Sequence, residues 1–193
     1  MCSRTVSLDE IPLALSYWNN TIAVGSQASD IIILDGVTGT QLATLSGHTD
    51  LVTSLTFSSD GISLVSGSDD YTVKLWDVQT GGVVKTFSGH TGWVHSVSIS
   101  ADYTRIASGS GDCTIHLWDI QTGGCHHVME QEGTVYHVNF SPTNLQYLLS
   151  HSSDKVWQWD INGHPIQPTY DGYHSAFSPD GTQFALCSRT VTV

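Results

Sequence analysis

Two sets of residues in this chain contain the serine, histidine and aspartate that nucleophilic catalysis requires. The sets are His48, Ser66 and Asp70, and His90, Ser108 and Asp112. In a hydrolase of this kind, the histidine takes the proton of the serine hydroxyl while the carboxylate orients the imidazole ring. Neither serine lies in a Gly-x-Ser-x-Gly turn, which exposes the nucleophile in many hydrolases, and the second set repeats the spacing of the first. The pattern therefore favours a structural role for both sets.

Three further histidines raise the question of a metal site. His116, His126 and His127 have no partner residues at a spacing that resembles a zinc ligand set, so we interpret them as strand-face or exposed side chains. A phosphate-binding glycine loop is also missing, since Gly67 and Gly109 follow the two serines within predicted strands. The sequence thus predicts no bound metal, no cofactor and no enzymatic activity.

The two sets belong to an internal repeat. Gly-His, Ser-Gly-Ser and Trp-Asp follow one another twice, with 42 residues separating His48 from His90 and Trp76 from Trp118. A period of about 40 to 45 residues with these dipeptides is typical of four-stranded β-propeller blades, each of which buries its faces against its neighbours. The predicted fold class is therefore an all-β propeller.

Alternation of apolar and polar residues places four short strands in each repeat. In the second unit we expect strands at Val52–Phe57, Ser63–Ser66, Thr72–Trp76 and Val83–Phe87, with a turn at Asp60-Gly61. The third unit repeats this order at Val94–Ile99, Arg105–Ser108, Thr114–Trp118 and Cys125–Met129. The first unit fits at Leu13–Tyr17, Thr21–Gly25, Asp30–Leu34 and Gln41–Leu45, and the fourth at Tyr136–Phe140, Gln146–Ser150 and Val156–Trp159.

A fifth unit begins after Gly172 but stops before its fourth strand. Its expected strands are Tyr173–Phe177, Gln183–Cys187 and Arg189–Val193. We expect the first residues of the chain to supply the missing strand, because a bare sheet edge promotes aggregation. The prediction is one domain over residues 1–193, with blades at about 11–50, 51–92, 93–133 and 134–172 and a closing blade made of 173–193 with 1–10. The identity of Cys2–Val6 with Cys187–Val191 has no physical explanation.

Composition narrows the partners and the compartment. The chain has 6 Lys and Arg against 18 Asp and Glu, and its net charge of −12 disfavours nucleic acid. The start of the chain lacks the apolar segment of a secretory signal, and no apolar run is long enough to cross a membrane. The four cysteines show no metal-ligand spacing, which favours reduced thiols and a cytoplasmic protein.

These residues and motifs resemble the WD-repeat, or β-transducin-like, propeller family. The resemblance implies that a histidine, a serine, an aspartate and a tryptophan form a hydrogen-bonded tetrad in each blade. The implied structural tetrads are His48, Ser66, Asp70 and Trp76 in the second unit and His90, Ser108, Asp112 and Trp118 in the third. The fourth unit keeps a partial tetrad of Ser150, Asp154 and Trp159, with Gln131-Glu132-Gly133 where Gly-His is expected, while Leu34 takes the tryptophan position of the first unit.

The resemblance also implies a function. Family members often bind proteins at one rim of the ring, and the matching positions are Leu51, Thr53, Asp69, Trp93, His95, Tyr136 and Tyr173, which we call the partner-binding rim. Trp93 stands out, because exposed tryptophans often anchor partners. We expect a non-catalytic scaffold for other proteins. The alternative is a lectin-like or peptide-binding propeller that uses Trp93, His95, Tyr136 and Tyr173 to hold its ligand.

The number of blades does not determine how the ring is closed. Rings in this family usually hold seven or eight blades, and this chain supplies five. The chain therefore forms a tight five-bladed ring, or forms a ten-bladed ring as a homodimer, or belongs to a longer protein. The complementary ends favour the dimer, since exchange of an identical element is a low-cost route to two-fold symmetry.

Overall fold

The computed structural model describes residues 12–143, 146–172, 174–178, 180–181 and 183–187. Every helix or strand assigned in these ranges is a β-strand. Within them there is accordingly no helix with the length and hydropathy that crossing a membrane requires. The predicted all-β class is confirmed.

The first four blades are antiparallel sheets of four strands that pair in sequence order. Blade one contains β1 (Pro12–Trp18), β2 (Thr21–Ser26), β3 (Ile31–Asp35) and β4 (Gln41–Leu45). Blade two contains β5 (Val52–Phe57), β6 (Ser63–Ser68), β7 (Thr72–Asp77) and β8 (Val83–Ser88). Blade three contains β9 (Val94–Ile99), β10 (Arg105–Ser110), β11 (Thr114–Asp119) and β12 (Cys125–Glu130). Blade four contains β13 (His137–Phe140), β14 (Tyr147–His151), β15 (Lys155–Asp160) and β16 (Pro165–Asp171).

The fifth unit is a two-stranded sheet of β17 (His174–Phe177) and β18 (Phe184–Cys187) in the described residues. Its predicted third strand at Arg189–Val193, and the first ten residues that we expected to complete it, lie outside the described residues. The identity between Cys2–Val6 and Cys187–Val191 also falls largely outside them. Closure of the ring by the N-terminus therefore stays a prediction.

The predicted strands agree with the observed ones to within about two residues. The second strands of blades two and three run two residues further than predicted, because Ser68 pairs with Val52 and Ser110 pairs with Val94 beyond a β-bulge. The predicted turn at Asp60-Gly61 is present, and Gly61 has a φ of 71°, a conformation that glycine adopts at little cost. The Asp-Gly pair thus located this turn correctly.

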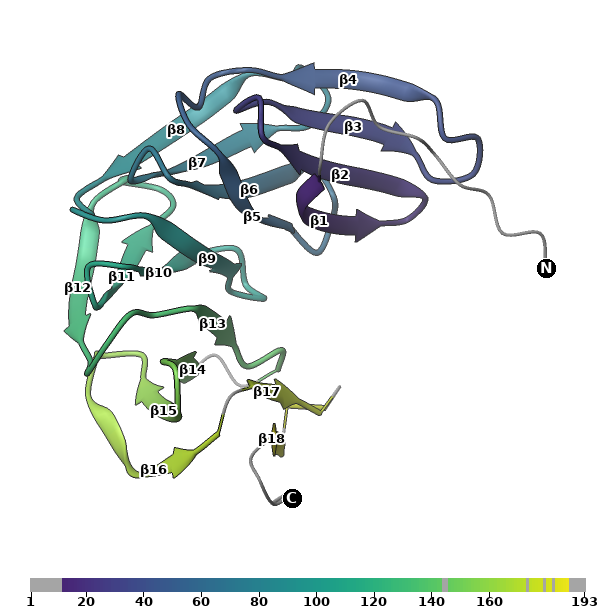
Figure 1. Ribbon diagram of the computed structural model, residues 1–193. Coiled ribbons are helices and arrows are strands. Elements are labelled where there is room, and N and C mark those ends of the chain that lie inside the picture. The colour runs from purple at the N-terminus through teal and green to yellow at the C-terminus, as the bar shows by residue number, and fades with distance from the viewer. Residues whose placement is uncertain (1–11, 144–145, 173, 179, 182, 188–193) are drawn as a thin grey trace.

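Figure 1 shows the sheets following one another along an arc, with β1, β5, β9 and β13 on its inner side and β4, β8, β12 and β16 on its outer side. The first strand of each blade contacts the first strand of the next, and β14 contacts β17. The arc of described sheets does not close, since blade one and the β17–β18 sheet lie at opposite ends of it (Figure 1).

Apolar side chains fill the space between successive blades. Leu45 of blade one packs in one cluster with Leu64 and Trp76 of blade two, and Phe87 of blade two packs with Trp118 of blade three. These side chains are all at most 2% exposed. Each large side chain of this kind contributes about 1.5 to 3 kcal/mol when fully buried, so packing between blades is the main stabilising term.

Serine side chains add a repeated hydrogen bond between first strands. The backbone N–H of Phe57 donates to Ser16 Oγ at 3.2 Å, and the N–H of Val97 donates to Ser54 Oγ at 3.0 Å. The same contact recurs one blade later, where the N–H of Val138 donates to Ser96 Oγ at 3.1 Å. Each of these N–H groups belongs to the first strand of a blade, whose ladder partner is the second strand of the same blade. The serine accepts a hydrogen bond from this backbone donor, and the bond helps to fix the position of one blade on the next.

Candidate functional site

Four side chains of blade two form a continuous hydrogen-bonded chain. The Trp76 indole N–H donates to Ser66 Oγ at 2.8 Å, and Ser66 Oγ lies 2.7 Å from His48 Nε2. On the other side of the imidazole ring, His48 Nδ1 lies 2.7 Å from a carboxylate oxygen of Asp70. With the proton on Nδ1, the ring donates to Asp70 and accepts from the Ser66 hydroxyl, so every group in the series has a partner. The structure thus brings together the four residues assigned to this tetrad.

The local turns position the two ends of this chain. His48 lies in the loop before β5, and Asp70 lies in the turn between β6 and β7, where Thr49 N–H and Thr72 Oγ1 also donate to its carboxylate. Burial alone would raise the pKa of Asp70, but the hydrogen bonds from His48, Thr72 and Thr49 outweigh burial and lower it. The aspartate therefore stays ionised and holds the histidine in one orientation.

The same geometry decides against catalysis by the serine. Ser66 and Ser108 are 0% exposed, and each hydroxyl already accepts a hydrogen bond from an indole N–H at 2.8 Å. A catalytic nucleophile needs access to substrate and a free direction of attack. Both serines lack these, so the serine, histidine and aspartate of each tetrad act as a structural unit.

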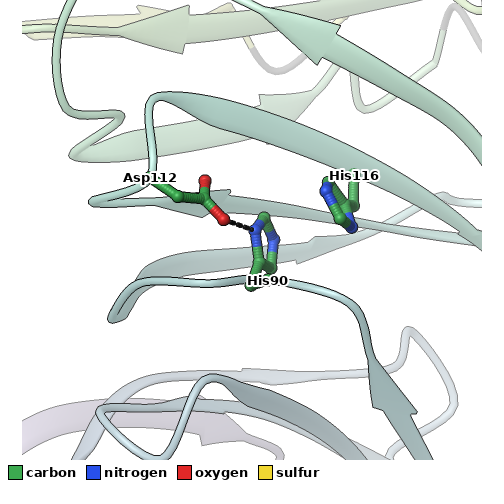
Figure 2. A group of neighbouring side chains, drawn as sticks. All are labelled: His90, Asp112 and His116. Atoms are coloured by element: carbon green, nitrogen blue, oxygen red, sulfur yellow. Dashed lines mark hydrogen bonds and ion pairs between the residues drawn. The ribbon is translucent and has the colours of Figure 1, made fainter.

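Blade three repeats the tetrad and adds a second histidine. His90 Nδ1 lies 2.9 Å from Asp112, His90 Nε2 lies 2.7 Å from Ser108 Oγ, and Trp118 Nε1 donates to the same hydroxyl. His116 comes from β11 and stacks on His90, with ring centroids 3.9 Å apart and an interplanar angle of 24° (Figure 2). Blade two has Lys74 at the equivalent position, so the stacked pair is particular to blade three.

Burial keeps this histidine pair neutral. His116 is 6% exposed, and burial together with the neighbouring His90 lowers its pKa to about 4 against opposition from Asp112. Burial also lowers the pKa of His90. Hydrogen bonds from Thr114 and from the Thr91 N–H, together with His90, lower the pKa of Asp112 against the effect of burial.

The ring nitrogens and carboxylate of His90, Asp112 and His116 lie within 4.8 Å of one another, so we tested whether they fit a metal ion. Imidazole binds a metal along the plane of its ring. Two nearly parallel stacked rings direct their lone pairs side by side rather than toward one point (Figure 2), and both nitrogens of His90 already have partners. A metal could bind here only after the tetrad of blade three had been broken.

The two other histidines that the sequence raised as possible metal ligands beside His116 lie elsewhere. His126 and His127 are neighbours on β12 with ring centroids 4.5 Å apart, and His126 is exposed. Neither belongs to the group around His90, so the structure does not gather the three histidines into one site.

Blade four contains a modified version of the tetrad. Trp159 Nε1 donates to Ser150 Oγ at 2.7 Å, and the Ser150 hydroxyl donates to Gln131 Oε1 at 2.6 Å, so the glutamine occupies the position of the missing histidine. Gln131 is 8% exposed, and its Nε2 is buried without a hydrogen-bond partner. In the amino-acid sequence Gln131 is recognisable only as a departure from Gly-His, and no signal there indicates its role.

The third residue of the predicted partial tetrad lies outside this cluster. Asp154 is exposed, and its carboxylate accepts a hydrogen bond from Ser153 Oγ at 3.4 Å. The Gln131 amide N–H could donate to a carboxylate, but Gln131 Nε2 has no hydrogen-bond partner, so Asp154 does not reach it. Including Asp154 in a cluster with Ser150 and Trp159 was therefore wrong in geometry, although its sequence position matches the repeat.

Three aromatic side chains lie close together on the predicted partner-binding rim. Trp93 and Tyr136 are 55% and 46% exposed, and His95 lies between them. The His95 ring centroid is 6.3 Å from that of Trp93 and 5.7 Å from that of Tyr136. Trp93 directly precedes β9, His95 is the second residue of β9, and Tyr136 directly precedes β13, so these rings join blades three and four.

Other predicted rim residues have structural contacts or fall outside the description. Thr53 is half-buried and its hydroxyl donates to the backbone oxygens of Val94 and Gly67, which connects blade two to blade three. Leu51 is half-buried and its backbone oxygen accepts the N–H of Asp69. Tyr173 lies outside the described residues.

Asp69 differs from the other rim residues because one of its carboxylate oxygens is buried and has no hydrogen-bond partner. Burial is the main cause that raises the pKa of Asp69, and the nearby charges of Asp50 and Asp70 add to it. The charge of His95 acts in the opposite direction and lowers the pKa of Asp69. The predicted rim therefore includes one acidic side chain with a buried oxygen that has no hydrogen-bond partner among the described residues.

Comparison with known proteins agrees with this geometry. Residues 39–77 and 81–119 match the family described as "WD domain, G-beta repeat", and these two matches contain both complete tetrads. The chain is 41% identical over 57 residues to "Lissencephaly-1 homolog 1" of Paramecium tetraurelia, a match that covers 30% of this chain and 14% of that protein. It is 48% identical over 56 residues to "Periodic tryptophan protein 2 homolog" of Schizosaccharomyces pombe, covering 28% of this chain and 7% of that protein.

Proposed function

We propose that this chain, two repeats of which match the WD-repeat family, is a non-catalytic platform that binds other proteins through its partner-binding rim. The observation that carries the proposal is the group of Trp93, His95 and Tyr136. Large aromatic side chains that stay exposed on a monomer are a feature of interface anchors, and these rings span two neighbouring blades.

The structural tetrads support the proposal by making the rim rigid. The loop before β9 carries His90, and the turn between β10 and β11 carries Asp112, so a buried hydrogen bond fixes both loops next to Trp93. A preorganised surface loses little conformational entropy when a partner binds. A fixed aromatic group of this kind suits recognition of a protein surface.

A truncation at the rim tests the proposal. Trp93→Ala and Tyr136→Ala should each abolish capture of protein partners from a cell extract, while Val84→Ala should leave it unchanged. Val84 is 56% exposed on β8, which makes it a control with nearly the same exposure as Trp93. Equal capture by Trp93→Ala and by Val84→Ala would refute the use of this rim. Binding to immobilised glycans without capture of any protein would favour the lectin-like alternative.

We also propose that the chain self-associates through the open face of blade one. Leu13, Leu15 and Tyr17 alternate along β1 and are 41%, 65% and 65% exposed, while Ala14 between them faces the cluster shared with blade two. An apolar sheet face that lacks a neighbour is a template for association. A second copy, arranged by two-fold symmetry, is the occupant that completes a ten-bladed ring.

Light scattering tests self-association. A dimer should scatter with twice the single-chain mass of 20.9 kDa, and Leu15→Lys should return it to the single-chain mass while Val128→Lys should not. Val128 is 55% exposed on β12, away from this face, and serves as the control. A mass near 20.9 kDa at all concentrations would rule out the dimer and favour a closed monomer or a longer parent chain.

A further inference from the structure

We propose that a cavity at the boundary of blades three and four binds a carboxylate, with the guanidinium of Arg105 as the group that holds it. The cavity has a volume of about 160 Å³ and is lined by Ser100, Asp102, Thr104, Arg105, Gln146 and Ile161. Ser100 directly follows the end of β9, whereas Trp93 directly precedes the start of the same strand. The cavity is therefore at the opposite end of the blade from the partner-binding rim, and binding there does not depend on the proposed function.

Two blades build the cavity. Blade three supplies the turn between β9 and β10, in which the backbone N–H of Arg105 donates to Ser100 Oγ at 2.9 Å. The same serine hydroxyl donates to the Asp102 carboxylate at 2.6 Å. Blade four supplies Gln146 and Ile161, which are joined by a hydrogen bond from the Ile161 N–H to the Gln146 backbone oxygen at 3.0 Å. The backbone around the cavity is thus fixed by hydrogen bonds on both sides.

The guanidinium of Arg105 has hydrogen-bond donors that the described residues do not use. Its Nη1 donates to the backbone oxygen of Ile161 at 3.1 Å, and this is the one hydrogen bond of the guanidinium among the described residues. A guanidinium carries five N–H groups in one plane, so several remain for a ligand. Arg105 is half-buried and three of the other lining residues are exposed, so a ligand can reach these donors from solvent.

The boundary of blades two and three shows what a cation does there when it only connects two blades. Lys85 Nζ donates to the backbone oxygens of Ile120 and Gln121 at 2.8 and 2.7 Å. Ile161 lies 41 residues after Ile120, and both directly follow a Trp-Asp pair, so Arg105 binds the equivalent carbonyl one blade later. The lysine uses two of its three N–H groups on these carbonyls, whereas Arg105 uses one of five. Connecting the blades therefore leaves most of the guanidinium unused.

The position of Arg105 is also exceptional within the repeat. In the paired strands of the other blades, Thr21, Ser63 and Tyr147 take its place opposite the aspartate that ends the third strand. The hydroxyl of Ser63 is hydrogen-bonded to that of Tyr103, so it already has a partner between blades two and three. Arg105 is thus the one cationic side chain at this position in the first four blades.

The size and charge of the cavity favour a carboxylate. Its volume is smaller than the 300 to 1,000 Å³ or so of cavities that hold a whole cofactor or drug-sized ligand, so it accepts one small group. A guanidinium pairs with a carboxylate or a phosphate through two parallel N–H···O bonds. Asp102 lines the same cavity, so a singly charged carboxylate is repelled less than a phosphate of higher charge. A small carboxylic acid and an acidic protein side chain both carry this group, and separate probes distinguish them.

NMR titration of the whole chain tests the site. The Nε–H signal of Arg105 is followed on addition of sodium acetate, with sodium chloride at the same ionic strength as the control for screening. We expect the signal to shift with acetate and to stay in place with chloride. The second probe is an acetylated and amidated peptide with one glutamate between glycine and serine residues, and the same peptide with glutamine is its control. Tighter binding of the glutamate peptide than of acetate assigns the site to an acidic protein segment, and the reverse order assigns it to a small carboxylic acid.

Arg105→Gln and Lys85→Gln are matched variants, because each removes one cation that connects two blades while only Arg105 lines the cavity. The backbone N–H signals of Thr104 and Ile161 report on the cavity in both. Arg105→Gln should weaken acetate binding about tenfold, whereas Lys85→Gln should bind acetate as the unchanged protein does. Asp102→Asn removes a like charge from the lining and should strengthen binding about two- to fivefold. Thermal melting checks that each variant is folded, and Arg105→Lys, which keeps the charge without the planar fork, should also weaken binding.

Three results would each overturn the carboxylate site. They are equal shifts of the Arg105 signal with acetate and with chloride, equal acetate binding by Arg105→Gln and Lys85→Gln, and stronger binding of inorganic phosphate than of acetate at the same ionic strength. Weaker acetate binding by Asp102→Asn would contradict the assigned charge effect and so the choice of an anionic ligand. None of these results bears on the partner-binding rim, whose own test is the effect of Trp93→Ala on capture of protein partners.

Discussion

Replacement of Ser66 by alanine is the perturbation that best measures what a buried tetrad contributes. Ser66 is 0% exposed and its hydroxyl joins Trp76 Nε1 at 2.8 Å to His48 Nε2 at 2.7 Å. Ser66→Ala removes the partner of both groups at once. Trp76 is 0% exposed and the His48 side chain is 0% exposed, so water cannot replace the lost hydroxyl without a rearrangement of the blade.

The magnitude follows from the two groups left without partners. Each buried group without a hydrogen bond costs about 1 to 3 kcal/mol, which gives about 2 to 6 kcal/mol for the pair. A domain of this size loses roughly 2 to 4 °C in melting temperature for each kcal/mol. At a middle value of about 4 kcal/mol, the melting temperature should fall by about 8 to 16 °C.

Thermal unfolding followed by circular dichroism measures this effect, with Ser88→Ala as the control. Ser88 is exposed at the end of β8, so its replacement should change the melting temperature by little. The double variant Ser66→Ala with Trp76→Phe should be less destabilised than the sum of the single variants by about 1 to 3 kcal/mol, because the indole N–H is then gone. A melting temperature for Ser66→Ala equal to that of Ser88→Ala, or fully additive single changes, would refute the assigned role of the tetrad.

Three further outcomes are expected. The pKa of His116 falls to about 4 in the folded chain from an ordinary value of 6.5, so the unfolded chain binds the proton more readily and stability should fall as the pH drops through this window. His116→Phe should reduce the pH dependence of the free energy of unfolding by up to about 3 kcal/mol, and an unchanged dependence, measured by denaturant unfolding between pH 7 and pH 4, would contradict this. Ser96→Ala should destabilise the contact of blades three and four by about 1 to 3 kcal/mol, because the Val138 N–H loses its acceptor, and hydrogen exchange at Val138 should be faster than in the unchanged protein. Deletion of residues 1–10 should cause unfolding or aggregation if these residues complete the fifth unit, whereas unchanged melting and solubility of the deleted chain would argue against closure by the N-terminus.

The repeat made much of the fold predictable. Apolar alternation and turn residues recur at 42 residues, so each unit could be interpreted with the help of the clearest one, and the strands of blades two and three were placed to within two residues. The resemblance to WD repeats, matched position by position, assigned His48, Ser66, Asp70 and Trp76 to one tetrad. What the repeat could not provide was the environment of a residue that departs from it.

Gln131 and Asp154 illustrate this limit. Asp154 stands at the position of the tetrad aspartate, and Gln131 lies in the segment where Gly-His is expected. In the structure the Gln131 amide takes the place of the histidine imidazole, whereas Asp154 lies outside the cluster of Ser150 and Trp159. Thr53 is a second example, since its position matches the binding rim while its hydroxyl connects two blades. Sequence spacing gives the position of a residue in its blade, whereas the contact it makes depends on the side chain that the next blade brings to it.

The amino-acid sequence by itself determined the all-β class and the period of the blades, because these depend on local alternation and on spacing along the chain, while its resemblance to WD repeats implied the two complete tetrads. The tertiary structure decided that the tetrad serines are inaccessible, that Asp69 has an unsatisfied oxygen and that the rings of Trp93 and Tyr136 both lie near His95. These properties arise where two blades meet, and burial at such a boundary is a property of the packed sheets rather than of any single segment.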